Sequence, residues 1–359
     1  MQAVARPWPA EATGPEARRR RDAAGRPDAP LRVGVVINPR ARAVRAGGPG
    51  LVESVARQAG AGLVRETPDL GSLRAALGHL VGVEGVNVLA TLGGDGTLHT
   101  AVNELLAFDR AAAEAGGPGA PLPALFALRG GTLNIVGRSL GTAGPPARAL
   151  ARFREAHRGA PLAAAPARPL PLLRVQSAAL GLRHGFVFGS EMVRHALEMY
   201  DVFGGGHAGL SRFLFEALRG PLFDTELWRR ERWRLTPPST PLAVTHAAGR
   251  TEVGRYAAAV ACTVDLAIAG GALRALRRPA APGAFSVRVI TETRAEALVQ
   301  MAPALMTGRP LGGTLDVAAT ALHLAGSFTL DGEVFPRLGP DDDGAVAVEL
   351  AAPLRALVG

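Results

Sequence analysis

Two short stretches combine glycine, threonine and a polar side chain directly before a helical pattern. The first is GGDGT at residues 93–97, which follows the apolar run VNVLATL. The second is GGTLN at residues 130–134, which follows the apolar run ALFAL. Backbone N–H groups at a helix N-terminus attract anions, so each turn is suited to bind phosphate. Tight turns that need glycine for conformational reasons alone would give the same pattern.

Asp95 lies at the centre of the first turn, where its carboxylate would repel a phosphate group. A cation such as Mg²⁺ between the two groups removes that repulsion. We therefore predict that Asp95 faces a metal ion. Thr97 is the expected N-cap of the following helix, and His99 is expected to be exposed on it.

Two further carboxylates occur in TLDGEVFP at residues 329–336, namely Asp331 and Glu333. Asp-Gly is common in hairpin turns, which makes a hairpin the simpler interpretation. In extended backbone the two side chains would share a face, as a general base and a metal-facing group require.

The surrounding pattern predicts an α/β region followed by a β-rich region. Apolar strands alternate with helical patterns from residue 31 to about 157, which is typical of a parallel sheet. Short strand-like runs dominate residues 158–359, with a helical insertion around residues 191–220. Residues 1–30 are rich in arginine and proline and are expected to be a disordered tail.

Composition excludes several mechanisms. All 40 basic residues are arginine, which excludes the P-loop lysine and Schiff-base chemistry. The single cysteine, Cys262, cannot form an intramolecular disulfide and is expected to be a buried strand residue. The net charge of +9 suits anionic partners, but no nucleic-acid motif accompanies it, so we expect no nucleic-acid partner.

In their order and spacing, INP at 37–39, GGDGT, GGTLN with Arg138 after it, and DGE at 331–333 resemble the diacylglycerol kinase catalytic domain. The chain is most similar to the bacterial lipid kinases of that superfamily, which also includes sphingosine and NAD kinases. The resemblance implies a Rossmann-like α/β domain with a parallel sheet and a C-terminal β-sandwich domain. It also implies that ATP binds in the cleft between them.

The resemblance further implies roles for individual residues. Asp331 would accept the proton of a lipid hydroxyl, Glu333 would help to hold Mg²⁺, and Asp95 would join the same metal network. The residues that would contact the nucleotide are Asn38, Gly93, Gly94, Gly96, Thr97, Gly131, Thr132 and Asn134. Arg138, one helical turn after Asn134, is a further expected phosphate partner.

The sequence departs from the family at three places, and at the first of them Arg-Ala-Arg at residues 40–42 replaces the Ser-Gly that follows Asn-Pro. Thr100 replaces a frequent glutamate, and Ile135 replaces a common aspartate. The function that the resemblance as a whole implies is an ATP-dependent lipid kinase acting on a diacylglycerol-like or sphingoid-like hydroxyl. An NAD kinase-like enzyme and a catalytically weakened nucleotide- or lipid-binding regulator are the two alternatives.

Residues 191–235 mix aromatic side chains with arginine, which suits either helices packed on the sheet or contact with an anionic membrane surface. The expected location is accordingly the cytoplasm, with peripheral contact at the inner membrane face as an option. The expected partners are a lipid substrate and, as an option, a second copy of the chain in a homodimer.

Overall fold

A computed structural model describes most of the chain. The described residues are 8–116, 121–177, 181–203, 209, 212, 215–216, 219–220, 222–235, 239–268, 273–291, 314–335 and 344–358. They form two compact units. The described residues from 8 to 170, together with 353–358, make the N-terminal unit, and those from 171 to 352 make the C-terminal unit.

The N-terminal unit is built on a parallel sheet with the strand order β2-β1-β3-β4. Its strands are β1 (Val33–Ile37), β2 (Val64–Glu66), β3 (Val88–Gly93) and β4 (Ala124–Arg129). The end of β17 (Ala345–Leu357) adds a fifth parallel strand, in which Ala356 pairs with Leu125 of β4. Every residue of β1 and β3 is buried, as expected for central parallel strands covered on both faces.

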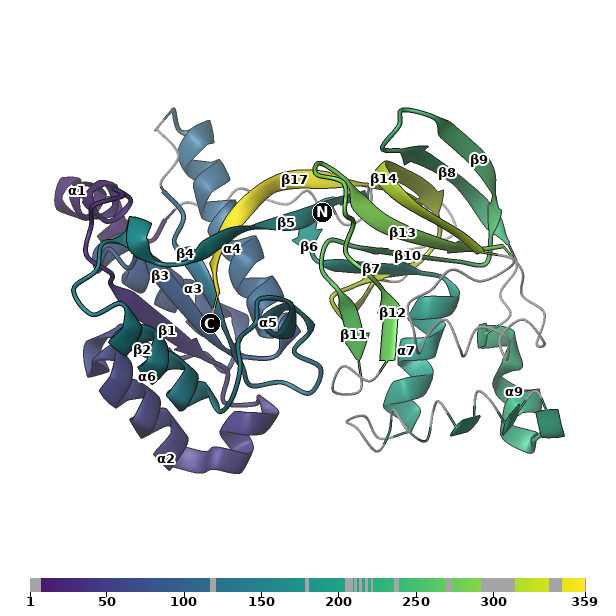
Figure 1. The fold of residues 1–359 in the computed structure, drawn as a ribbon, viewed down its shortest axis with the longest axis horizontal. Helices are drawn as coiled ribbons and strands as arrows, with labels where there is room; N and C mark the ends of the chain where they lie inside the picture. The colour runs from purple at the N-terminus through teal and green to yellow at the C-terminus, as the bar shows by residue number, and fades with distance from the viewer. Residues whose placement is uncertain are drawn as a thin grey trace. The chain divides into compact units, whose positions relative to one another are not determined.

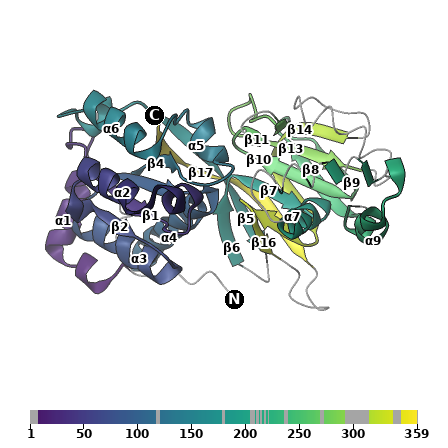
Figure 2. The same ribbon diagram turned by 90° about the horizontal axis from the view of Figure 1, so that it is seen from below.

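Helices cover both faces of this sheet (Figures 1 and 2). They are α1 (Pro15–Ala24), α2 (Arg42–Ala59), α3 (Leu70–Leu77), α4 (Asp95–Glu114), α5 (Ile135–Ser139) and α6 (Pro146–Ala156). Short helical turns are η1 (Ala10–Ala12), η2 (Ala61–Leu63), η3 (Gly78–Val83) and η4 (Leu162–Ala164). Helices α2 and α6 share one apolar core with the strands, and Figure 2 shows α6 and α3 on opposite sides of the sheet.

Helix α4 follows the first glycine-rich turn, as predicted. The apolar residues spaced for one helix face, Leu98, Ala101, Val102 and Leu105, are buried. His99 is also buried, with 3% of its surface exposed, so the prediction of an exposed histidine is wrong. The reason is that α4 packs against its surroundings over more than the single face that its apolar spacing marks.

Over residues 8–30 the structure differs from the expectation of a disordered tail, and residues 1–7 of that expected tail lie outside the described residues. Residues 10–12 and 15–24 are helical, and Trp8 is buried with its ring stacked on Phe108 of α4 at 4.6 Å. The ring of Trp8 also lies under the guanidinium of Arg21 at 4.9 Å. Composition predicted disorder, but one tryptophan and a few alanines supply the apolar contacts that dock this segment.

The C-terminal unit is an antiparallel β structure with a helical insertion. The strand order is β16-β15-β7-β10-β13-β14, and β14 also pairs with β8. The strands are β5 (Ala167–Ser177), β6 (Gly181–Gly185), β7 (Val187–Ser190), β8 (Thr240–His246), β9 (Thr251–Tyr256), β10 (Ala258–Cys262), β11 (Leu266–Ile268), β12 (Leu273–Leu276), β13 (Phe285–Ile290), β14 (Thr314–Ala325), β15 (Phe328–Leu330) and β16 (Glu333–Phe335). The inserted helices are α7 (Met192–Val202) and α9 (Glu226–Leu235).

These observations confirm the predicted α/β region followed by a β-rich region. The core of the C-terminal unit includes Phe188, Tyr256 and Phe285, each fully buried. Cys262 is buried in β10, as predicted. Within the described residues, no helix combines the length and the apolar composition that crossing a membrane requires.

The division between the units differs from the boundary expected near residue 158. It falls between Leu170 and Pro171 within β5, and again between Ala352 and Pro353 within β17. The chain therefore returns to the N-terminal unit at its end. Composition marks the proline-rich loop near residue 160, but it does not reveal that two strands continue through the boundary.

Candidate functional site

The two glycine-rich turns lie at the carboxyl ends of neighbouring strands. We call Gly93–Thr97 the first glycine loop and Gly130–Asn134 the second. Gly93 pairs with Arg129 across β3 and β4, and the N–H of Gly130 donates to the carbonyl of Gly93 at 2.8 Å. The carboxyl edge of a parallel sheet is where α/β proteins commonly bind ligands.

Most of these glycines are required because the two loops pack directly on each other. A Cβ atom on Gly131 would lie 2.4 Å from the Cα of Gly94, and one on Gly130 would lie 2.9 Å from the nitrogen of Gly93. Neither backbone can move without shifting a strand end. Close packing therefore explains these residues without a ligand.

The missing side chain of Gly93 leaves room for Thr97. Thr97 in turn links the first glycine loop to Asn38 of the INP motif. A Cβ atom on Gly93 would lie 2.3 Å from Oγ1 of Thr97. The same Oγ1 accepts a hydrogen bond from Nδ2 of Asn38 at 3.0 Å. The structure thus brings together Asn38 and Thr97, two residues predicted to contact phosphate. The N-cap of α4 is Gly94 rather than Thr97, so that prediction is wrong.

Gly96 differs from the other glycines of the first loop. A Cβ atom there would meet no atom within 4 Å, and its φ angle does not lie in the left-handed region. Neither packing nor backbone conformation therefore requires a glycine at this position. Gly96 lies in the first turn of α4, where backbone N–H groups have no partner within the helix.

The carboxylate of Asp95 is anchored to the second glycine loop. Its Oδ2 accepts the N–H of Ile135 at 3.0 Å, and its Oδ1 accepts the N–H of Val136 at 3.1 Å. Asp95 therefore caps the start of α5 and ties the two loops together. The sequence did not predict this role. Every non-proline residue has a backbone N–H group, so the residue types at 135 and 136 do not indicate that these groups donate to Asp95.

Asn134 closes the second loop on itself. Its side chain accepts the N–H of Gly131 at 2.8 Å and donates to the carbonyl of the same residue at 2.7 Å. The φ angle of Asn134 is 50°, a left-handed conformation that asparagine tolerates better than most residues. Thr132 is half-buried, and its hydroxyl has no hydrogen-bond partner among the described residues.

Two arginines lie beside the glycine loops. Arg129 ends β4, and burial lowers its pKa, as does the positive charge of Arg138 to a smaller extent. The Nη1 of Arg129 donates to the carbonyl of Thr142 at 3.4 Å, while its buried Nε has no partner among the described residues. Two like charges beside exposed helix N–H groups favour an anion. Arg138 was predicted, whereas Arg129 was missed.

A small cavity between the loops has a volume of about 10 Å³, which is room for one water molecule. It is lined by residues that include Thr91, Gly94, Asp95, Arg129 and Asn134. A nucleotide does not fit inside this cavity. Its phosphates would have to lie over the surface of the loops, where Gly96 leaves space.

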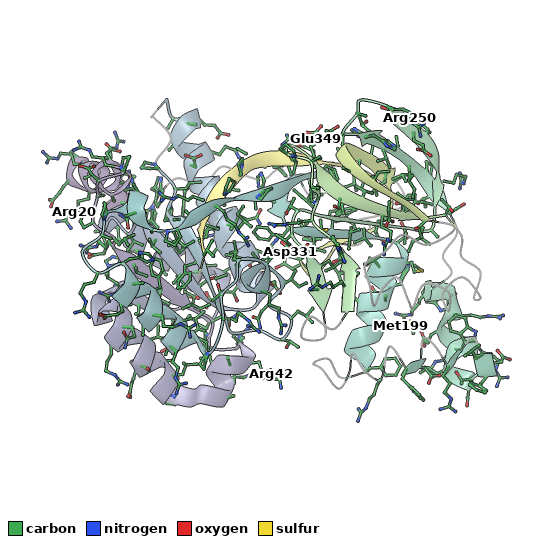
Figure 3. The ribbon with its side chains drawn as sticks, in the orientation of Figure 1. Arg20, Arg42, Met199, Arg250, Asp331 and Glu349 are labelled. Atoms are coloured by element: carbon green, nitrogen blue, oxygen red, sulfur yellow. The ribbon has the colours of Figure 1, made fainter. Side chains whose placement is uncertain are left out.

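Asp331 and Glu333 belong to the C-terminal unit. Asp331 and Gly332, with φ angles of 51° and 91°, form the two-residue turn between β15 and β16, so the hairpin interpretation is confirmed. Oδ1 of Asp331, which Figure 3 labels, accepts the N–H groups of Phe186 at 3.0 Å and Val187 at 2.9 Å. Glu333 is exposed at the start of β16.

The predicted Mg²⁺ ligands do not form a metal centre by themselves. Among the described residues, no three aspartate, glutamate, histidine or cysteine side chains gather as metal ligands. Mg²⁺ usually takes one or two carboxylates together with the phosphate oxygens of a substrate. Both oxygens of Asp95 accept a backbone N–H group, and a single carboxylate is the ligand type that such a shared site takes from the protein.

Comparison with known proteins was made by sequence and by structure. Residues 32–163 match the diacylglycerol kinase catalytic domain family. A search of curated protein sequences gave no match. A crystal structure of a diacylglycerol kinase from Bacillus anthracis strain Sterne superposes with a TM-score of 0.56 at 14% identity, covering 91% of this chain and 97% of that chain.

A second crystal structure, of a candidate diacylglycerol kinase from the same strain, gives a TM-score of 0.60 at 15% identity with the same coverage. At this identity the likeness establishes a shared fold across both units. The two glycine loops and Asn38 all lie within residues 32–163, the segment that matches the family. The part of the chain that carries the glycine loops therefore matches the diacylglycerol kinase catalytic domain family.

Proposed function

We propose that this protein is an ATP-dependent kinase that phosphorylates a hydroxyl group of a lipid. The observation that carries the proposal is the open space at Gly96 in the first turn of α4, together with Arg129 and Arg138 at the second glycine loop. Nothing internal requires a glycine there, while a phosphate oxygen needs close access to the backbone N–H groups. The family match supports nucleotide use at this place.

In this proposal the N-terminal unit supplies positioning and positive charge. The N–H groups of α4 and the guanidinium groups of Arg129 and Arg138 stabilise the negative charge that develops on the transferred phosphoryl group. Asn38 orients Thr97, and Asp95 fixes the second loop against the first. A bound Mg²⁺, held by Asp95 and the phosphates, would neutralise further charge.

We assign the acceptance of the hydroxyl proton to Asp331. Two backbone N–H groups fix its carboxylate, and its positive φ angle holds it at the tip of the turn. A carboxylate is one of the side chains that act as a general base, and these contacts hold it in a defined orientation. Glu333 follows two residues later and is assigned to the metal, as the resemblance implies.

A lipid substrate is favoured by an apolar and basic surface in the C-terminal unit. Phe223 and Trp233 are 72% and 56% exposed. Arginines 229, 230 and 232 lie on α9 between them in sequence, and the guanidinium of Arg234 lies over the ring of Trp233 at 5.0 Å. Exposed aromatic rings with arginine suit the interface of an anionic membrane.

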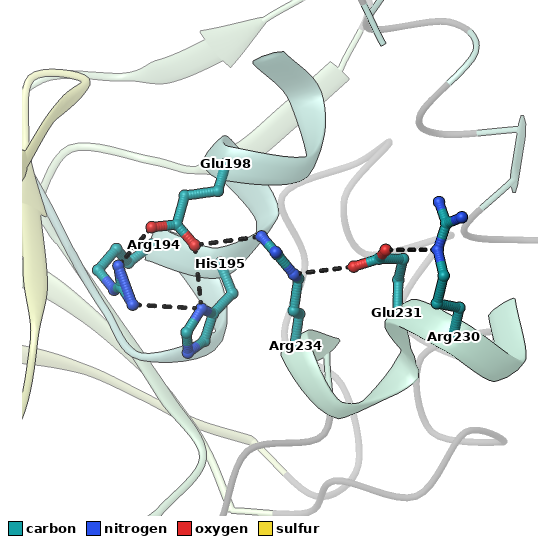
Figure 4. Close-up of polar contacts among 6 residues, drawn as sticks. All are labelled: Arg194, His195, Glu198, Arg230, Glu231 and Arg234. Atoms are coloured by element: carbon teal, nitrogen blue, oxygen red, sulfur yellow. Dashed lines mark hydrogen bonds and ion pairs between the residues drawn. The ribbon is translucent and has the colours of Figure 1, made fainter. Parts of the chain in front are cut away.

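Helix α9 is held firmly enough to present this surface. Trp228 is buried with Met192 and Met199 of α7. Glu198 of α7 pairs with Arg234 of α9 at 3.4 Å, and Arg234 also pairs with Glu231 at 2.9 Å (Figure 4). One side of α9 therefore binds α7 while Trp233 remains exposed.

The kinase proposal is tested by phosphate transfer from labelled ATP in the presence of Mg²⁺. The acceptors are diacylglycerol, sphingosine and NAD, with the two lipids in mixed micelles. We expect transfer to a lipid, with loss of at least about 100-fold in Asp331→Asn, because general-base catalysis contributes 10² or more. Asp69→Asn is the matched control, because Asp69 also accepts a backbone N–H at a helix start, but in α3.

The other outcomes separate the alternatives. Transfer to NAD without lipid would replace the lipid kinase by an NAD kinase-like enzyme. Binding of ATP without transfer to any acceptor would indicate the regulator, for which Ile135 in place of the family aspartate is the motivating observation. Activity that is unchanged in Asp331→Asn would refute the assigned base.

The membrane proposal is tested separately with vesicles of phosphatidylglycerol or phosphatidylcholine. We expect co-sedimentation with the anionic vesicles, and a reduction in Trp233→Ala and Phe223→Ala. Val253→Ala is the control, because Val253 is 77% exposed on β9 of the same unit. Equal losses in all three variants, or none, would refute this surface.

A further inference from the structure

A second cavity lies at the opposite end of the parallel sheet from the glycine loops. Its volume is about 180 Å³, and it is lined by residues from α1, from η3 and its flank, and from the starts of β3 and β4. Asn87, directly before β3, frames it by donating from Nδ2 to the carbonyls of Ala24 and Pro30 at 3.1 and 3.0 Å. This cavity is large enough for a small molecule.

Two arginines and no acidic residue line this cavity among the described residues. Arg21 comes from α1, and only 8% of its surface is exposed. Its Nη1 donates to the carbonyls of Ala12 and Gly82, and its Nε and Nη2 have no hydrogen-bond partner within the described part of the chain. Asp22, the nearest acid in the sequence, is exposed, and burial lowers the pKa of Arg21 more than Asp22 raises it.

Arg355, near the end of β17, supplies the second positive charge. It is half-buried, and its Nη2 donates to the carbonyl of Leu162 at 2.7 Å. No ion pair among the described residues involves Arg355 or Arg21. Carbonyl groups satisfy single N–H donors but do not neutralise a guanidinium charge, so burial of the Arg21 side chain is costly.

The cavity is distinct from the glycine loops. It begins at Asn87 and Ala124, the amino ends of β3 and β4, whereas the loops begin at Gly93 and Gly130. Six residues of strand, at roughly 3.3 Å each, separate the two ends by about 20 Å. A ligand of the kinase site therefore cannot account for this second pair of arginines.

We propose that this cavity binds a small phosphate-containing anion between Arg21 and Arg355. A phosphate group presents several acceptor oxygens and up to two negative charges, which match two guanidinium groups with unused donors. The site is formed only when α1 is docked, because Arg21 comes from that helix. Binding of the anion therefore stabilises the docked N-terminal segment.

The test uses the full-length protein and calorimetric titration with inorganic phosphate and with glycerol phosphate at constant ionic strength. We expect saturable binding, and about ten-fold or greater weakening in Arg355→Gln, because a charge-assisted hydrogen bond is lost. Arg21→Lys keeps the positive charge but loses the planar guanidinium group with its several N–H donors. This variant should weaken binding less than Arg355→Gln does. Tighter binding of glycerol phosphate would identify a phosphomonoester rather than free phosphate as the ligand.

Two controls locate the binding site. Arg65→Gln changes an arginine of the same unit that also donates to backbone carbonyls but does not line the cavity, and it should bind normally. Arg138→Gln weakens the glycine-loop site and should leave this binding intact. The fluorescence of Trp8, which lies under Arg21, should change on binding, and the change should vanish in Trp8→Phe.

The proposal is overturned if neither anion binds the wild-type protein. It is also overturned if binding is lost in Arg138→Gln and unchanged in Arg355→Gln, because the anion would then occupy the glycine loops.

Discussion

Gly96 and Gly131 should respond oppositely to the same substitution by alanine. A methyl group on Gly131 would lie 2.4 Å from the Cα of Gly94, which is 1.0 Å short of the 3.4 Å at which ordinary contact begins. Relief requires movement of a strand end, so we expect Gly131→Ala to lower the free energy of unfolding by about 1–3 kcal/mol. At Gly96 the methyl group meets nothing.

Gly96→Ala should therefore leave the fold intact, and the higher helix propensity of alanine should add up to about 1 kcal/mol of stability. If phosphate oxygens approach the backbone at this position, the methyl group displaces them. Loss of one charge-assisted hydrogen bond, about 1.5–3 kcal/mol, corresponds to at least a ten-fold rise in the Kd for ATP. Stability and ATP affinity should thus move in opposite directions.

Urea denaturation followed by circular dichroism measures the stability, and calorimetric titration measures ATP binding. Gly62→Ala is the control, because Gly62 also has open space around its missing Cβ atom and lies outside the loops. Wild-type ATP affinity in Gly96→Ala would refute the phosphate site at the start of α4. Wild-type stability in Gly131→Ala would refute the close packing of the loops.

Three further predictions concern stability and reactivity. The hydrogen bonds from Ser72 lower the pKa of Asp69, so Asp69 stabilises the fold above its unfolded pKa of about 3.9, and this contribution is lost as pH falls through the lower folded value. Urea titrations at several pH values should therefore show that Asp69→Asn destabilises the protein at neutral pH and less so in acid. Glu104 accepts two hydrogen bonds from Arg74, at 2.6 and 3.1 Å, and Glu104→Gln should lower the free energy of unfolding by about 1.5–3 kcal/mol, whereas an unchanged urea midpoint would contradict this. Burial raises the pKa of Cys262, so a thiol reagent should label it only at the rate of unfolding, and rapid labelling of native protein would contradict its burial.

Much of the fold could be predicted from the sequence. Apolar runs mark β1, β3 and β4, and the spacing of Leu98, Ala101 and Val102 marks α4. These signals are local, since strand and helix periodicity depend on residues a few positions apart. The positions of the two glycine loops between strand and helix follow from the same local patterns, and the family resemblance that rests on them is confirmed over residues 32–163.

The interactions inside the candidate site could not be predicted in this way. Asp95 bonds to Ile135, 40 residues away, and Asp331 bonds to Phe186, 145 residues away. In each case the donor is a backbone N–H group, which every non-proline residue carries. Residue identity therefore gives no hint of the partner, and the roles of Asp95 and Asp331 in catalysis remain predictions.

By itself, the sequence determined the alternation of strands and helices around the glycine loops, the location of those loops and the absence of lysine chemistry. Only the tertiary structure decided that Gly131 packs on Gly94, that Trp8 docks the N-terminal segment, and that Arg21 and Arg355 line one cavity. The physical reason is the separation along the chain between the residues that interact. Periodicity and turn chemistry act between neighbours along the chain, whereas close packing and charge burial depend on which distant segments the folded sheet brings into contact.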